Sequence, residues 1–441
     1  MKFYDTPAAI KQWGETEEAP HVQWGDLFFD LIFVGVAFTV GHMLEHTGVS
    51  AWGVFDSMMV FLILIGAWHS KLSLTARFDV NDMVHKFAEL LEFCFVALIA
   101  VHIGSLHSHD EDVATANIQG FCVGLFLHKV LYILKWSEIS FFATAANERS
   151  FSQFQLVLKA LTVCIDAWAI QESRKKSNVH WVLVLCYASF LLEQLIMFGR
   201  IVFQIKLSRE CIVPLHITYL THRVGELIML MIGEGVLSLT LASVNHEILW
   251  SFYASFIAGV LLTCCLMFTE YSTAEFHADR HVLRRSGTLG VSWMHIKYIQ
   301  AFIFVAFGVG LRMLLQRYLH TAPPFPVICL FSFSLATHTV LRQTVEWMQM
   351  GERWSNWKML LCRFLTTVAL LVLPFMADNL KAMGMTGCHM LCFGLLFVIL
   401  YSLTEAFDPN IGPIEGRFHT HHALIKLHAV SAFKKGKSKQ H

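Results

Sequence analysis

Long apolar stretches recur along the whole chain, and short polar segments separate them. The bilayer core offers no water to backbone N–H and C=O groups, so each crossing needs a helix of about 20 mostly apolar residues. Twelve stretches meet this requirement: 26–46, 53–72, 86–105, 118–136, 153–171, 180–200, 219–243, 248–271, 295–316, 326–347, 357–377 and 386–406. The pattern therefore predicts an all-α, polytopic transmembrane helix bundle of about 12 spans.

Polar segments flank this apolar region at both ends. Residues 1–25 contain no apolar run of the kind found in a cleavable signal peptide. Residues 407–441 form a basic, His-rich tail. We expect a cytosolic N-terminal segment (1–25), a transmembrane domain (26–406) and a cytosolic tail. The fifth stretch is the weakest, because Lys159 and Asp166 interrupt it.

The distribution of Lys and Arg predicts the orientation. An even number of spans places both termini on one side, and the loops on that side carry most of the Lys and Arg residues. Residues 174–176 are a basic cluster on the other side and argue against this assignment, whereas loop 107–117 is acidic. We expect both termini in the cytosol, and a plasma membrane more than an internal one.

Composition supports the membrane assignment and excludes other classes. Hydrophobic residues make up 55% of the 441 positions and charged residues 15%, against about 25% charged in soluble domains. Lys+Arg and Asp+Glu balance at 33 each, so no nucleic-acid partner is indicated. The 11 cysteines include no C-x-x-C pair, and no cofactor-binding motif is present. The expected partner is the lipid bilayer, and the chain is compatible with a homo-oligomer.

Charged side chains inside the spans are the first functional candidates, because a charge deep in the bilayer costs several kcal/mol. Some of them share a helix face by their spacing, such as the i,i+4 pair Asp26 and Asp30. The expected ion or substrate pathway comprises Asp30, Glu89, Glu92, Arg223, Glu226 and Glu234, with Lys129, Glu193 and Arg342 as candidate pairing partners.

Glu234 is the best single candidate for proton exchange. It lies deep in its span, between Gly233 and Gly235, which would let another helix or a ligand approach the backbone closely. Two other interpretations of the whole set remain open. The charges could form static ion pairs between helices, or their side chains could reach the lipid headgroups from helix ends.

Three histidine-containing segments are weaker candidates. His42, Glu45 and His46 fit the pattern H-x-x-E-H of a zinc peptidase class, but they lie at the end of the first span. Loop 107–112 could sense pH or collect cations, or it could be a plain hydrated loop. The tail segment 417–422 could bind a metal or anionic lipid, or simply be solvated.

An offset of 211 residues relates the two halves of the chain. It aligns Lys86 with Lys297 and Glu89 with Gln300. A parallel repeat of six spans would divide the domain into 26–200 and 219–406, the plan of two-bundle transporters.

Three motifs resemble the low temperature requirement A (LtrA) family. The segment His21-Val-Gln-Trp-Gly-Asp-Leu-Phe-Phe-Asp30-Leu-Ile-Phe-Val34 is similar to its opening, with Asp26 where Glu is usual. The segment from Trp68 to Asp82, with Thr75-Ala-Arg-Phe-Asp79 and Asp82, resembles the next motif. His216 to Glu234 resembles a third, with His222 replacing the usual Glu before Arg223. The resemblance implies a multi-pass membrane protein named for a growth phenotype in the cold, with no settled activity.

Together these observations favour a transporter or channel for protons or a small ion or solute. One alternative is a membrane-embedded, lipid-modifying enzyme. The other is a structural or sensory protein linked to growth in the cold.

Overall fold

A computed structural model describes eleven long helices, one short helix and two very short strands. It covers residues 3–10, 24–47, 49–79, 82–108, 110–175, 179–204, 213–241, 250–272, 281–317, 323–350 and 357–380, with 394 and 398. The helices are α1 (Trp24–His46), α2 (Ala51–Thr75), α3 (Met83–Ile103), α4 (Glu111–Phe142), α5 (Ala146–Arg174), α6 (Val179–Gln204), α7 (Ile217–Thr240), α8 (Trp250–Ser272), α9 (Val282–Arg285), α10 (Gly287–Arg317), α11 (Phe325–Met350) and α12 (Trp357–Leu380).

Eleven of the twelve predicted spans coincide with a long helix, and the protein is an integral multi-pass membrane protein. Eight helices are long and apolar enough to cross a bilayer: α1, α2, α4, α5, α6, α8, α10 and α11. The weak fifth segment is among them, as α5. Helices α3 and α7 are not, and each carries three charged residues. The predicted spans 357–377 (α12) and 386–406 are not among the eight either, and 386–406 and the tail lie outside the described residues. The count of about 12 therefore stays a prediction.

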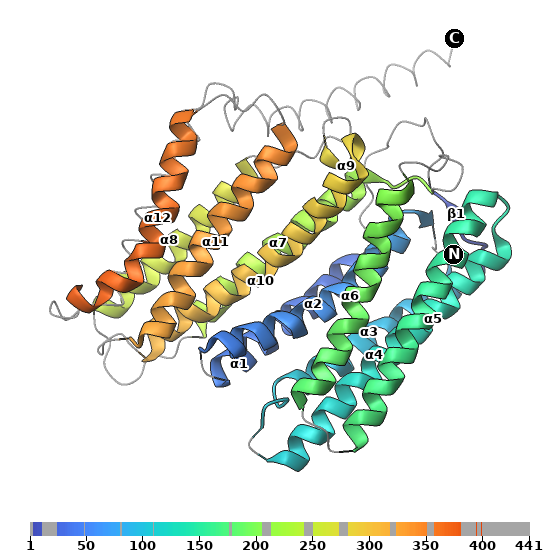
Figure 1. Ribbon diagram of the computed structural model, residues 1–441, viewed down its shortest axis with the longest axis horizontal. Coiled ribbons are helices and arrows are strands. Elements are labelled where there is room, and N and C mark those ends of the chain that lie inside the picture. Colours follow the sequence, from blue (N-terminus) through green and yellow to red (C-terminus); the bar gives the residue numbers. More distant parts are fainter. Residues whose placement is uncertain are drawn as a thin grey trace, which may run out of the picture.

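The helices form two groups that meet around α1 and α10 (Figure 1). In one group α3 packs on α4, α4 on α5 and α5 on α6; in the other α7 packs on α8 and α10, and α11 on α10 and α12. Helix α1 contacts α2 and α3 in its own group and α7 and α10 in the other. Of the eight apolar helices, α10 is the most enclosed: 89% of its most apolar segment of 18 residues is buried.

The N-terminal segment is attached to the connection between α2 and α3, which the sequence pattern did not predict. Strand β1 (Ala8–Ala9) pairs antiparallel with β2 (Phe78–Asp79). The Ile10 amide donates to the Arg77 carbonyl at 2.9 Å. Each strand has only two residues, so the architecture remains all-α.

Candidate functional site

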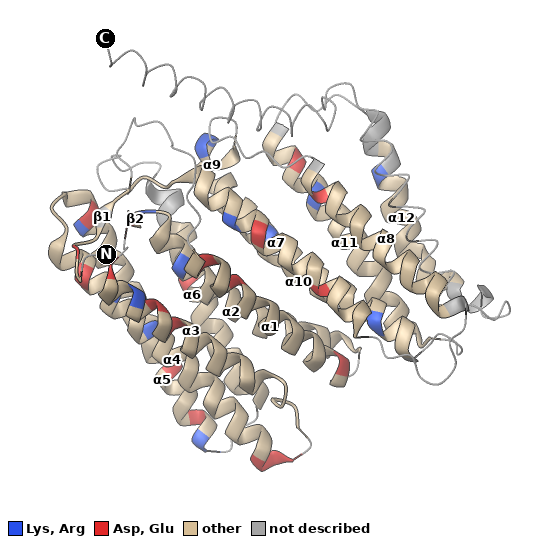
Figure 2. Cartoon of the chain, turned by 180° about the vertical axis from the view of Figure 1, so that it is seen from behind, with Lys and Arg blue, Asp and Glu red and all other residues tan. Residues whose placement is uncertain are grey.

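Charged residues lie within the helices as well as at their ends (Figure 2). The central contact joins α1 to α7, where the Arg223 guanidinium binds both carboxylate oxygens of Asp30. Its Nη1 lies 2.6 Å from Oδ2 and its Nη2 lies 2.8 Å from Oδ1. The Trp68 indole N–H on α2 also donates to Asp30, at 2.9 Å. Asp30 and Arg223 are 1% and 3% exposed, so this fork-shaped pair is excluded from solvent.

Arg223 has two further partners. Its Nη1 donates to Glu226 at 2.8 Å, and its Nη2 donates to the backbone carbonyl of Asp26 at 3.1 Å. The Tyr219 hydroxyl donates to the Asp26 carboxylate at 2.8 Å. Asp30, Arg223 and Glu226, three residues of the expected pathway, are therefore in direct contact.

Lys71 on α2 connects this cluster to α3. Its Nζ lies 3.8 Å from Asp26 and donates to Glu89. Glu89 also accepts from Lys86 at 3.0 Å. The aromatic rings of Phe29 and Phe93 lie 4.9 and 4.8 Å from the Lys71 ammonium, which places this cation between two ring faces.

Glu92 belongs to a separate cluster between α3 and α4. It is 0% exposed and accepts hydrogen bonds from the Tyr132 hydroxyl and the Lys135 ammonium, each at 2.6 Å. The His128 ring nitrogen Nε2 lies 3.8 Å away. Both oxygens of Glu92 are thus occupied by donors from α4.

The three candidate pairing partners do form ion pairs, but with residues outside the predicted pathway. Lys129 lies 2.7 Å from Asp166. Glu193 accepts from Lys159. Arg342 lies 3.2 Å from Glu346, which Arg363 also binds. Lys159 and Asp166, which interrupt the apolar pattern of the fifth span, are the partners of charges on α6 and α4.

Glu234 has a different environment from the other acids. It is 1% exposed; Oε1 accepts from the Ser238 hydroxyl at 2.8 Å, and Oε2 is buried with no hydrogen-bond partner. Among the described residues no Lys or Arg nitrogen lies within 4.0 Å of it. Eleven residues separate Glu234 from Arg223, about 16 Å along α7 and three helical turns, so both lie on one face.

The close helix approach predicted beside Glu234 occurs on one side only. A Cβ added at Gly308 of α10 would lie 3.0 Å from the Gly235 Cα, so the two backbones touch where α7 and α10 cross. A Cβ added at Gly233 would meet nothing within 4 Å. Gly235 therefore serves the helix crossing, and Gly233 does not.

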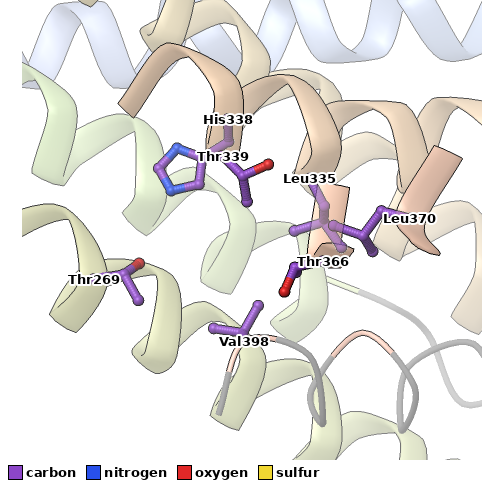
Figure 3. A pocket seen from close by; sticks show the side chains of 7 residues that line it. All are labelled: Thr269, Leu335, His338, Thr339, Thr366, Leu370 and Val398. Carbon is purple, nitrogen blue, oxygen red and sulfur yellow. The ribbon is translucent and has the colours of Figure 1, made fainter. Parts of the chain in front are cut away.

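A second polar cluster lies in the other half of the molecule. Glu270 on α8 accepts from Lys297 and, at 2.6 Å, from the Gln300 amide on α10. Gln300 Nε2 lies 3.1 Å from the His338 ring nitrogen on α11. His338 also lines a small pocket with Thr269, Leu335, Thr339, Thr366, Leu370 and Val398 (Figure 3).

The zinc-peptidase-like pattern does not bring its three side chains together. The His42 and His46 rings contact each other, with their Nε2 atoms 3.0 Å apart. Glu45 instead pairs with Arg312 of α10. The tail histidines lie outside the described residues.

Residues 75–82 of the second family-like motif form the junction with the N-terminal segment. Asp82 caps α3, accepting from the His85 amide, and also accepts from the Asp5 amide, both at 2.9 Å. Burial alone would raise the pKa of Asp82, but these hydrogen bonds hold it below its usual value. Burial and the neighbouring Glu138 raise the pKa of Tyr4, in the same junction, to about 12.

Sequence reasoning missed three residues of the central cluster: Trp68, Lys71 and Tyr219. Lys71 is the last residue but one of the second apolar stretch, 53–72, whereas α2 continues to Thr75 and holds Lys71 inside the helix. Trp68 and Lys71 are three positions apart and thus on one helix face, a signal that could have identified both. Tyr219 lies four positions before Arg223 and so on the same face of α7, which is a signal of the same kind.

Comparison with known proteins gives one match. The family described as "Bacterial low temperature requirement A protein (LtrA)" matches residues 21–396. No curated protein and no solved structure matches the chain. The matched range contains all the helices and every ion pair described above.

Proposed function

The chain belongs to the bacterial low temperature requirement A family, and from this premise we propose that it is a transporter or channel for protons or a small ion or solute. Asp30, Glu89, Glu92, Arg223, Glu226 and Glu234 form the polar part of the pathway, and Glu234 exchanges the proton. The observation that carries the proposal is the buried Glu234 carboxylate, which has one oxygen without a hydrogen-bond partner and, among the described residues, no Lys or Arg nitrogen within 4.0 Å.

Most acids in the membrane domain have a fixed cation, which stabilises their charged form throughout any cycle. Among the described residues, the only hydrogen-bond donor to Glu234 is the Ser238 hydroxyl. Taking up a proton there removes a buried charge without breaking an ion pair. The same property suits a group that alternates between two protonation states, and it distinguishes Glu234 from Asp30, Glu89 and Glu92.

The apolar residues between Glu234 and Arg223 support a gated pathway. Leu227 and Met231 lie on the same face of α7 and are both 0% exposed. A proton or ion therefore needs a helix movement to pass between the two polar levels. The backbone contact of Gly235 with Gly308 lets α7 and α10 shift against each other without separating side chains.

A flux screen in proteoliposomes tests the proposal. The purified chain should move protons, a common ion or a small solute faster than empty liposomes do, and Glu234→Gln should reduce this flux at least tenfold. Glu172→Gln removes an acid at the end of α5 that accepts from Lys175 and Trp168, outside the proposed pathway, and should leave the flux unchanged. A wild-type protein that is silent toward all these solutes would overturn the proposal.

A further inference from the structure

Three potential metal ligands meet at one end of the bundle, where α1 and α3 end and α2 and α6 begin; we call it the distal end. Asp56 lies near the start of α2, His107 follows α3, and His180 is the second residue of α6. One donor atom from each lies within 4.8 Å of the other two. Among the described residues, this is the only cluster of three or more such groups.

The distances within this cluster suit a single ion. Asp56 Oδ2 lies 3.0 Å from His180 Nδ1 and 3.7 Å from His107 Nε2. Ligand atoms about 2.1 Å from a tetrahedral zinc ion lie about 3.4 Å apart. The two imidazole rings have centroids 5.2 Å apart, so both can face the same point as the carboxylate.

Hydrogen bonding alone does not account for the arrangement. Asp56 and His180 are close enough for a hydrogen bond, but His107 Nε2 is too far from Asp56 for one. That nitrogen is buried and has no hydrogen-bond partner among the described residues. A buried imidazole nitrogen without a hydrogen-bond partner has lost its bound water and gained no other contact in exchange. A metal ion between this nitrogen and Asp56 would supply the missing partner.

The backbone around each ligand is held by the hydrophobic core. Val60 on α2, Leu106 beside His107 and Val182 on α6 are each 0% exposed. Asp56 is 5% exposed, whereas His180 lies at the rim. Rigid supports of this kind are what orient the ligands of a metal site.

We propose that Asp56, His107 and His180 bind one divalent transition-metal ion at the distal end. Two imidazoles and a carboxylate favour zinc or a neighbouring transition metal over calcium or magnesium, which prefer oxygen ligands alone. Three protein ligands leave coordination positions open to water or another ligand. The ion would tie α2 and α6 to the segment that follows α3.

Access to the site is from the aqueous side of the membrane surface. Trp52 and Trp181 are 76% and 49% exposed beside it, and exposed tryptophans of membrane proteins gather at the headgroup level. The neighbouring His42 and His46 could supply only two metal ligands, because Glu45 forms an ion pair with Arg312. They are therefore a matched control at the same end of the bundle.

Cobalt(II), a spectroscopic stand-in for zinc, tests the site in purified full-length protein carrying no polyhistidine tag. Wild type should bind one more cobalt ion tightly than Asp56→Asn or His107→Gln does. Each substitution should weaken cobalt binding at this site by at least about 100-fold, because loss of a residue that only supports a ligand weakens binding by up to about that factor. His46→Gln should bind like wild type. The tail histidines are present in every variant, so the difference reports on the cluster.

A fourth variant keeps the test valid if the buried substitutions impair folding. His180→Cys changes a rim residue and should retain the ion, with a new thiolate-to-cobalt charge-transfer band in the near ultraviolet. Equal cobalt binding by wild type and Asp56→Asn, or a His180→Cys protein that binds cobalt without this band, would overturn the proposal.

Discussion

Arg223 has more hydrogen-bond partners in the central contact than Asp30 has. Arg223 binds Asp30, Glu226 and the Asp26 carbonyl, whereas Asp30 accepts only from Arg223 and Trp68. Removing one member of a buried ion pair costs about 3–5 kcal/mol, because it leaves the other charge uncompensated. The cost therefore depends on which partners remain.

We expect Arg223→Gln to lower stability more than Asp30→Asn. The Arg223 substitution leaves a buried Asp30 with only the Trp68 N–H, at a cost of about 3–5 kcal/mol. The Asp30 substitution leaves Arg223 with Glu226. Thermal unfolding of the detergent-solubilised variants measures both, with Glu172→Gln as the control. An equal or reversed order would contradict the assigned contacts.

At the scale of helices, the crossing of α7 and α10 depends on the absence of a side chain at Gly308. A Cβ at Gly308 would meet backbone atoms of α7, which cannot rotate away. Gly308→Ala should therefore lower stability by about 1–3 kcal/mol through overpacking. Gly233→Ala is the matched control, since its Cβ meets nothing within 4 Å and alanine favours helix. Thermal unfolding should show no loss for Gly233→Ala, and equal losses would refute the crossing.

The junction between the N-terminal segment and α3 should depend on pH. The folded-state pKa of Asp82 lies below its usual value of about 3.9, so its stabilising effect is present above that pH and is lost as the pH falls through the lower folded value. Asp82→Asn should therefore expose the Asp5 amide at pH 7. Hydrogen exchange, corrected for intrinsic rates, measures this exposure. The neighbouring, exposed Asp79→Asn is the control, and continued protection in Asp82→Asn would contradict the prediction.

The sequence alone predicted the helices well, because the length and apolar composition of each stretch are enough to indicate a helix. It could not assign the partners of the charges, because contacts such as Asp30 with Arg223 join positions 193 residues apart. Lys159 and Asp166 interrupt an apolar run in the sequence, and only the fold shows that their partners Glu193 and Lys129 lie on other helices. The two short strands carry no period-2 pattern long enough to detect.

At the scale of the whole molecule, α1 joins the two helix groups through a large apolar surface and through polar contacts near both of its ends: Asp30 with Arg223, Asp26 with Tyr219, and Glu45 with Arg312. The 211-residue offset aligns Lys86 and Glu89 on α3 with Lys297 and Gln300 on α10, and each pair is in hydrogen-bond contact, at 3.0 and 3.1 Å. This agreement supports the duplication, which stays a prediction. It would place the Asp30–Arg223 contact between the first helices of the two halves, where a transporter of two bundles would have its centre.

A paired measurement on Glu234→Gln tests the central claim most directly. Flux in proteoliposomes and thermal stability are determined on the same preparations of wild type and variant. Because Glu234 forms no direct ion pair among the described residues, the account predicts an unchanged or higher unfolding temperature together with a flux reduced at least tenfold. An unchanged flux with a lower unfolding temperature would contradict it and identify Glu234 as a structural residue.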